Sequence, residues 1–195
     1  MTRIKLCGLS REEDIRTANE LMPDYVGFVF WEKSRRYVEP VRAEKLRKIL
    51  AEGISAVGVF VDEKPENISA LANSGVIDIV QLHGQESEEY IACLRKLIHA
   101  PIIKAFRFGE VRETTADYVM IDSGMGTGKT FDWSGISTTR PYFLAGGLTP
   151  ENVRTAIRTL HPFAVDVSSG IETDGVKDAE KIRAFVEAVR EEDKE

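Results

Sequence analysis

A thiol and a carboxyl group, each at the end of a short apolar run, are the residues of this chain that could do chemistry together. Cys7 ends the run 3–7, and Asp122 ends the run 118–122. Both runs have the length and composition of β-strands, so each side chain is expected at the C-terminal tip of a strand. An enzyme that moves a proton between neighbouring carbons needs one general base and one general acid. Cys7 and Asp122 are therefore the candidate catalytic residues.

Each of these residues also has a structural interpretation. Cysteine is small and commonly buried, so Cys7 could simply pack in a core, as we expect for Cys93 within a helical segment. Asp122 follows Tyr-Val-Met-Ile, a strand expected to be buried. A carboxyl group is costly there unless it is hydrogen-bonded or functional, which favours a functional role for Asp122.

The composition is that of a chain of ordinary size and hydrophobicity. The 195 residues, 43% of them hydrophobic, suit one globular domain and indicate neither disorder nor a membrane protein. A net charge of −6 with scattered Lys and Arg argues against nucleic acid as a partner, since a phosphate backbone needs a basic face. No run approaches the roughly 20 apolar residues of a membrane span, and no signal peptide is recognised. Two cysteines are too few for a disulfide framework, so we expect a cytoplasmic protein.

Apolar runs rich in Val, Ile and Phe alternate with helical patterns along the chain. Eight strands are expected, at Arg3–Cys7, Tyr25–Phe30, Ala56–Val61, Ile79–His83, Ile102–Phe106, Tyr118–Asp122, Tyr142–Ala145 and Ala164–Val167. Their alternation with helices indicates a parallel sheet, and their number favours a compact α/β fold, a (β/α)₈ TIM barrel forming a single domain over residues 1–195, rather than an open doubly wound sheet. Residues 108–117 leave room for only a turn or two of helix between the fifth and sixth strands.

The helical segments carry start signals and apolar faces. Ser10 followed by Glu13 fits a capping box, and Thr149-Pro150-Glu151 fits an N-cap, a first-turn proline and an acid. The expected buried faces are Leu46, Ile49 and Leu50; Ile91, Leu94, Leu97 and Ile98; Val153, Ala156, Ile157 and Leu160; and Ile182, Phe185, Val186 and Val189.

Further polar residues lie at the same strand tips, where the active site of a TIM barrel is found. Lys5 precedes Cys7 by two residues, so both point to one face of their strand, and Gln81 and His83 repeat this spacing on the fourth strand. Gln81 and His83 could act in the site or be satisfied interior polar groups. Asp166 on the eighth strand is a candidate substrate-binding residue, or the partner of Lys5 in an interior ion pair.

The loops after strands seven and eight form a candidate phosphate site. Small residues let backbone N–H groups reach phosphate oxygens, and a helix N-terminus adds a favourable dipole. Glycines could also serve only as tight turns, but two such loops on neighbouring strands favour phosphate binding. The candidate residues are Gly146, Gly147, Ser168, Ser169 and Gly170.

An Arg-Arg pair follows the second strand on the same face of the predicted barrel. An isolated pair of this kind is usually a solvated basic loop. Beside a phosphate site, however, Arg35 or Arg36 could hold a planar carboxylate in a bidentate contact.

Taken together, these residues resemble the phosphoribosylanthranilate isomerase family of tryptophan biosynthesis. The similar stretches occur in family order over essentially the whole chain and are specific as a set. They are Lys5-Leu-Cys-Gly8, Gly27–Phe30 with Ser34–Tyr37, Val57–Val61, Val80-Gln-Leu-His-Gly84, Ile103–Phe106, Asp122 with Gly126–Trp133, Leu144–Val153 and Val165–Glu172.

The resemblance implies a TIM barrel that converts N-(5′-phosphoribosyl)anthranilate to 1-(2-carboxyphenylamino)-1-deoxyribulose 5-phosphate by an Amadori rearrangement without cofactor or metal. By match, Cys7 takes the place of the general base, Asp122 that of the general acid and Arg36 that of the carboxylate-binding arginine. The phosphate places are taken by Gly146, Gly147, Ser168, Ser169 and Gly170.

Three positions depart from the family pattern. Met125 stands where the family has the first of two glycines, which leaves the geometry of the loop 123–130 open. Asp174-Gly175 replaces a frequent Pro-Gly ahead of Lys177. Arg35 stands where Pro or Lys is common, so either arginine could hold the carboxylate.

The proposed chemistry requires a shifted pKa in each catalytic group. A free thiol has a pKa of about 8.5, so a base at neutral pH needs that value lowered by positive charge, and Lys5 is the candidate for this. Asp122 needs the opposite shift, and burial would raise the pKa of its carboxyl group.

Three other functions compete with this interpretation. An indole-glycerol-phosphate synthase would need a lysine and glutamate framework at the strand tips, and a dual-substrate isomerase of histidine biosynthesis would need an aspartate pair; neither is found. A non-catalytic sensor of phosphorylated ligands is disfavoured by the intact acid–base pair. We therefore expect a small phosphosugar substrate, no nucleic-acid or membrane partner, and a monomer or homodimer.

Overall fold

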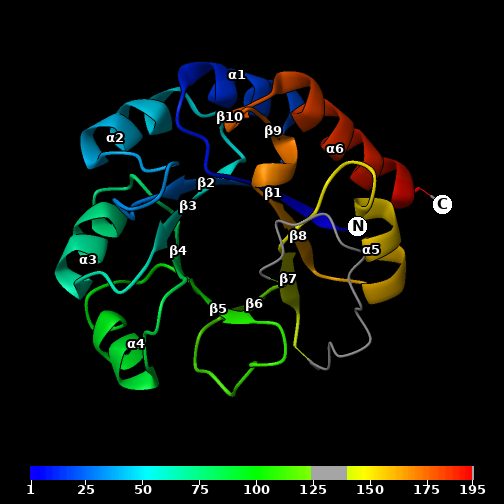
Figure 1. Cartoon of the computed structure of the whole chain (residues 1–195). Coiled ribbons are helices and arrows are strands. Elements are labelled where there is room, and N and C mark those ends of the chain that lie inside the picture. Colours follow the sequence, from blue (N-terminus) through cyan, green and yellow to red (C-terminus); the bar gives the residue numbers. More distant parts are fainter. Residues whose placement is uncertain (124–139, 195) are drawn as a thin grey trace.

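Eight parallel strands close into a barrel in chain order in the computed structural model, which describes residues 1–123 and 140–194 (Figure 1). Every predicted strand is present, and no end differs from its prediction by more than one residue, so the predicted fold is confirmed. The strands are β1 (Arg3–Cys7), β2 (Tyr25–Val29), β3 (Ser55–Phe60), β4 (Ile79–Leu82), β5 (Ile102–Arg107), β6 (Tyr118–Asp122), β7 (Tyr142–Ala145) and β8 (Ala164–Val167).

Helices surround this barrel within the described residues (Figure 1). None of them is long and apolar enough to cross a membrane. A 3₁₀ turn, η2 (Ser169–Ile171), and a two-stranded antiparallel hairpin of β9 (Glu172–Thr173) and β10 (Val176–Lys177) follow β8. The α-helices are α1 (Glu12–Leu21), α2 (Pro40–Ile49), α3 (Pro65–Asn73), α4 (Glu88–Leu94), α5 (Val153–Leu160) and α6 (Ala179–Glu192).

Both predicted helix starts are wrong by a few residues. Helix α1 begins after Arg11, and the carboxylate of Asp14, not Glu13, accepts hydrogen bonds from the backbone N–H groups of Ser10 and Arg11. Because the N-cap is Arg11 and not Ser10, the N3 position of the capping box falls on Asp14. Helix α5 begins at Val153 after a turn at residues 150–152, and the Asn152 side chain bonds the backbone on both sides of that turn.

The predicted apolar faces are correct where the helix packs on the barrel. All four predicted positions of α6 are buried, and so are Leu46 of α2 and both Ile91 and Leu94 of α4. Ile49 and Leu97 are exposed instead, because α2 ends at Ile49 and α4 at Leu94, so the helical periodicity no longer applies there.

The segment between β5 and β6 forms no helix, in line with the short spacing in the sequence. Among residues 1–123 and 140–194, the next helix after α4 is α5, which follows β7 (Figure 1).

Side chains fill the barrel interior, so only its C-terminal mouth can hold a ligand. Phe143 is fully buried at the centre, with its ring centroid 5.5 Å from that of Tyr25 and 5.8 Å from that of Tyr118. A separate small cluster of Cys7, Val29 and Val59 lies at the C-terminal ends of β1, β2 and β3. The packed interior thus supports a mouth whose wall contains Cys7.

Candidate active site

Cys7 lies at the end of β1 with only 7% of its surface exposed. Its neighbour across the ladder is Gly27 of β2, where a Cβ atom would lie 2.8 Å from Cys7 Sγ. Glycine at this position therefore gives the sulfur the room that any larger residue would take. Cys7 packs with its neighbours, as its structural interpretation expects, and it also lies at the mouth of the barrel.

A buried ion pair lies next to the thiol. Lys5 Nζ is 2.6 Å from Asp166 Oδ1 across the β1–β8 ladder, and Lys5 is fully buried. This confirms the predicted interior ion pair. Burial alone would lower the pKa of Lys5, but the charge of Asp166 and a hydrogen bond with Cys7 raise it, so Lys5 stays protonated. A role of Asp166 in binding substrate stays a prediction.

The predicted lowering of the Cys7 pKa is wrong in sign. Burial raises the pKa of the Cys7 thiol above that of a free cysteine, and the Asp166 carboxylate adds to this effect. Lys5 acts in the predicted direction and lowers the pKa, as does the charge of Lys177, but the two lysines do not outweigh burial. The sequence indicated the charged partner but not how completely the thiol is removed from water.

Three cations surround the carboxylate of Glu172, which is the main feature that the sequence analysis missed. Arg36 binds it with two hydrogen bonds, from Nε to Oε1 at 2.5 Å and from Nη2 to Oε2 at 2.9 Å. Arg35 Nη2 lies 2.7 Å from Oε2, and Lys177 Nζ lies 2.8 Å from Oε1. Burial would raise the pKa of Glu172, but the hydrogen bonds from Arg36 and Lys177 lower it. The cluster therefore keeps an excess of positive charge beside Cys7.

The hairpin after β8 is what brings this carboxylate into place. Glu172 and Lys177 are directly opposite each other in the β9–β10 ladder, closed by the two-residue turn Asp174-Gly175 with positive φ at both residues. Lys177 Nζ also donates to the backbone oxygen of Ser168 at 2.8 Å. The sequence offers one hint of this arrangement. Glu172 is an acidic residue at the end of the family-like stretch Val165–Glu172, and no role is assigned to it from the sequence.

Arg36 and Arg35 differ in how they are placed. The Arg36 side chain is 21% exposed, and its Nη1 has no hydrogen-bond partner within residues 1–123 and 140–194. The Arg35 side chain is 60% exposed and makes one contact to Glu172. Because Glu172 fixes one edge of the Arg36 guanidinium, the other edge is held ready for an anion.

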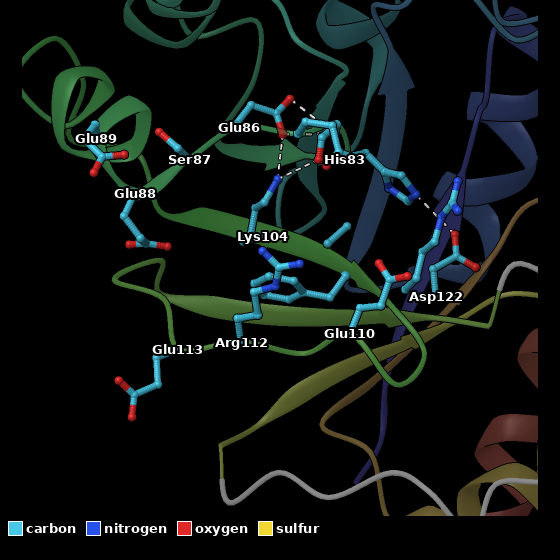
Figure 2. Close-up of a pocket in the computed structure, with 15 residues that line it drawn as sticks. His83, Glu86, Ser87, Glu88, Glu89, Lys104, Glu110, Arg112, Glu113 and Asp122 are labelled. Atoms are coloured by element: carbon cyan, nitrogen blue, oxygen red, sulfur yellow. Dashed lines mark hydrogen bonds and ion pairs between the residues drawn. The ribbon is translucent and has the colours of Figure 1, made fainter.

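Asp122 ends β6 and meets His83 from the end of β4. His83 Nε2 lies 3.2 Å from Asp122 Oδ2, and His83 Nδ1 lies 2.9 Å from Gln81 Nε2 (Figure 2 shows the His83–Asp122 contact). The Asp122 side chain is 27% exposed, so the predicted burial of this carboxyl is only partial. Gln81 and His83, the two polar residues noted on the fourth strand, are therefore linked to the candidate acid Asp122 by hydrogen-bond contacts.

A cavity of about 660 Å³ opens beside this pair, where the wall lacks a helix between β5 and β6 (Figure 2). His83 and Asp122 line its inner end, and Glu88 and Arg112 line its outer part. The buried Lys104 forms its floor, with Nζ 2.7 Å from Glu86 Oε2 and 2.9 Å from the backbone oxygen of Gly84. This ion pair fastens the loop that carries His83 to β5.

The loops after β7 and β8 contact each other as the phosphate prediction requires. A Cβ atom at Gly170 would lie 1.9 Å from the backbone oxygen of Leu148, so only glycine allows this approach. Gly146 and Gly147 both have positive φ, and Ser168 and Ser169 begin the η2 turn on the neighbouring strand end. The five residues are brought together at one side of the mouth, and their binding of phosphate stays a prediction.

Some residues of interest lie outside the described part of the chain. These are Met125 and the family-like stretch Gly126–Trp133, within residues 124–139. In the described residues, no group of three or more His, Cys, Asp or Glu side chains could hold a metal ion.

Comparison with known proteins links this geometry to one enzyme family. Residues 4–188 match the family model described as N-(5′phosphoribosyl)anthranilate (PRA) isomerase. A protein named N-(5′-phosphoribosyl)anthranilate isomerase from Endomicrobium trichonymphae is 43% identical, over 97% of this chain and 99% of that protein.

Two solved structures show the same architecture. A phosphoribosyl anthranilate isomerase bound to reduced 1-(o-carboxyphenylamino)-1-deoxyribulose 5-phosphate is 36% identical, with a TM-score of 0.81 over 98% of this chain and 100% of that one. Monomers of a dimeric phosphoribosylanthranilate isomerase from Thermotoga maritima are 38% identical, with a TM-score of 0.84 over 98% of this chain and 100% of that one.

The raised pKa of Cys7 can be measured directly. In a Cys93→Ser background Cys7 is the only thiol, and only its thiolate reacts with iodoacetamide. We expect the midpoint of alkylation rate against pH to lie above about 8.5, the value for free cysteine. Lys177→Met should move the midpoint to still higher pH, because it removes a charge that lowers this pKa.

The control is Lys45→Met, which removes an exposed lysine on α2 and should leave the midpoint unchanged. A midpoint at or below 8.5 in the parent protein, or no movement in Lys177→Met, would contradict the charge balance described for Cys7.

Proposed function

The chain belongs to the N-(5′-phosphoribosyl)anthranilate isomerase family of tryptophan biosynthesis, and we propose that it catalyses the family's Amadori rearrangement by acid–base catalysis. The substrate is N-(5′-phosphoribosyl)anthranilate, and the product is 1-(2-carboxyphenylamino)-1-deoxyribulose 5-phosphate. The observation that carries the proposal is the placement of a thiol on β1 and a carboxyl on β6, at the same mouth and three strands apart around the barrel.

Asp122 acts first, as the general acid. It gives a proton to the ring oxygen of the ribose, the C1′–O bond breaks, and the anthranilate nitrogen takes up the positive charge as an iminium. Asp122 is left as a carboxylate. Its partial exposure at the mouth supports this role, because a carboxyl group there is accessible to a ligand, and His83 orients it through Oδ2.

Cys7 acts second, as the general base. The iminium makes the hydrogen on C2′ acidic, and the thiolate removes it to give a neutral enolamine. The enolamine becomes the ketone product when C1′ takes up a proton and the C2′ hydroxyl loses its own. Only the thiolate can act as the base, and burial keeps its fraction low. Lys5 and Lys177 oppose burial, which supports their role in maintaining a reactive fraction of Cys7.

Two positive regions of the mouth suit the two anionic ends of the substrate. The free edge of Arg36 can hold the anthranilate carboxylate, since Glu172 occupies only the other edge. The loops with Gly146, Gly147, Ser168, Ser169 and Gly170 offer backbone N–H groups to the phosphate at the ends of β7 and β8. An acidic chain thereby gains local attraction for a substrate with two anionic groups.

The remaining features of the proposal follow from the family. We expect residues 1–195 to act as one barrel domain in the cytoplasm, with a small phosphosugar as substrate and no cofactor. The protein is a monomer or a homodimer; the dimeric relative from Thermotoga maritima supports considering the second state.

Substitution of the two catalytic groups tests the mechanism. We expect Cys7→Ser and Asp122→Asn each to lower kcat by roughly 10²- to 10⁴-fold, the usual contribution of a general acid or base. Ligand affinity should stay near that of the parent protein, because neither change removes a charge contact to the substrate's anions. Loss of substrate fluorescence with freshly generated phosphoribosylanthranilate measures turnover, and Cys93→Ser is the control that should keep it. Near-normal turnover in Cys7→Ser would refute its role as the base.

Substitution of the two neighbouring arginines should affect KM to different extents. Arg36→Ala is expected to raise KM by roughly 10- to 100-fold, the loss of a charge-assisted contact. The buried Glu172 keeps Arg35 and Lys177 as partners in this variant. Arg35→Ala removes an exposed side chain and should change KM by less than about threefold. An equal effect of the two substitutions on KM would show that Arg36 is not the carboxylate-binding residue.

A further inference from the structure

We propose that Gln81 is a positioning residue for the general acid: it fixes the imidazole of His83 in the Nε2–H tautomer, and this N–H holds the carboxyl group of Asp122. The inference rests on the proposed function, since it takes Asp122 as the acid. It assigns a role to a buried amide that the acid–base mechanism itself does not use.

The three side chains form a chain of hydrogen bonds from the barrel interior to the mouth. Gln81 on β4 is 1% exposed, and its Nε2 lies 2.9 Å from His83 Nδ1. His83 Nε2 lies 3.2 Å from Asp122 Oδ2, across from β4 to the end of β6. The His83 side chain is 34% exposed and that of Asp122 is 27% exposed, so both lie at the mouth, whereas Gln81 lies beneath it.

The direction of the hydrogen bonds follows from the amide. An amide nitrogen only donates, so Nδ1 of His83 must accept, and in a neutral imidazole the proton then lies on Nε2. The second N–H of Gln81 points to Met120 Sδ at 3.3 Å. Reversing the amide would place its oxygen against that sulfur, a weak acceptor without a hydrogen to give. Met120 therefore helps to fix the orientation of Gln81.

The amide oxygen of Gln81 shows that this arrangement has a cost. Oε1 is buried and has no hydrogen-bond partner within residues 1–123 and 140–194. A buried acceptor without a partner lowers stability, and such groups in folded proteins call for an explanation. An apolar side chain of the same length would fill the space without that cost. The presence of Gln81 at this position is therefore not explained by stability alone.

The fixed tautomer suits the change that Asp122 undergoes. When Asp122 gives its proton to the ring oxygen, its carboxylate accepts the His83 Nε2–H more strongly than the neutral acid did. The proton of His83 stays on Nε2, so His83 stabilises the carboxylate through a hydrogen bond and transfers no proton. The other tautomer would turn a nitrogen lone pair toward Oδ2 and oppose the new negative charge.

The tautomer itself is the most direct observable. The chain has three histidines, His83, His99 and His161, so the imidazole ¹⁵N signals of labelled protein can be assigned with a His83→Asn reference. The spectra are recorded at pH 8.5, about two units above the pKa of free histidine. We expect His83 to show a protonated Nε2 and an unprotonated Nδ1. A protonated Nδ1 in the parent protein would overturn the proposal, whether or not any variant folds.

Gln81→Met provides the functional test. It removes the donor to Nδ1 and the unpaired oxygen, so the melting temperature should stay the same or rise. We expect kcat to fall roughly 10-fold or more with KM within about twofold, and the His83 signals to move toward a mixture of tautomers. Gln85→Met is the matched control, an exposed glutamine that should keep both kcat and the His83 signals. An unchanged kcat in Gln81→Met would contradict the inference.

A double substitution separates action through His83 from a general disturbance. In a His83→Asn background, Gln81→Met should have little further effect on kcat, because the two residues act on Asp122 as one unit. A full additional loss would show that Gln81 acts by another route. Failure of the proposed function looks different: Asp122→Asn would then keep its turnover. If Asp122→Asn loses turnover while Gln81→Met does not, only the role of Gln81 is wrong.

Discussion

The buried ion pair between Lys5 and Asp166 links the first strand of the barrel to the last, next to the thiol of Cys7. Its two partners are 2.6 Å apart and almost fully removed from water, so loss of either would leave an uncompensated charge, at a cost of about 3–5 kcal/mol. The pair joins β1, which carries Cys7, to β8, which leads into the proposed phosphate loop. One interaction thus contributes both to the surroundings of the sulfur and to the position of that loop.

The electrostatics of the mouth resolve an apparent conflict between an acidic protein and an anionic substrate. The chain carries a net charge of −6. At the mouth, however, three cationic side chains, Arg35, Arg36 and Lys177, contact the single carboxylate of Glu172. Lys177 connects this cluster to both sides, because its charge acts on the Cys7 thiol and its Nζ donates to the backbone oxygen of Ser168. Because Glu172 holds one edge of Arg36, it orients the guanidinium and leaves part of its charge for a ligand.

Strand positions, the closed barrel and the Lys5–Asp166 pair could be predicted from the sequence, because buried parallel strands leave continuous apolar runs and two-residue spacing fixes a face. The helix starts could not, since a shift of the N-cap by one residue, from Ser10 to Arg11, moves the capping acid from Glu13 to Asp14. The sign of the Cys7 pKa shift depends on a balance between burial and charge that spacing does not reveal. The role of Glu172 emerged only from the contacts of the hairpin after β8. Gln81 could be named from the sequence, but its contacts with His83 and Met120 could not.

The central claim is that Cys7 and Asp122 face one substrate from different walls of the same mouth. A crystal structure of this chain with reduced 1-(o-carboxyphenylamino)-1-deoxyribulose 5-phosphate, an unreactive product analogue, tests it most directly. The account predicts Cys7 Sγ and a carboxylate oxygen of Asp122 in contact with the sugar chain from opposite sides, about 3–3.5 Å from it. An analogue seated in the mouth with either group out of contact, or with both groups on the same side, would contradict it.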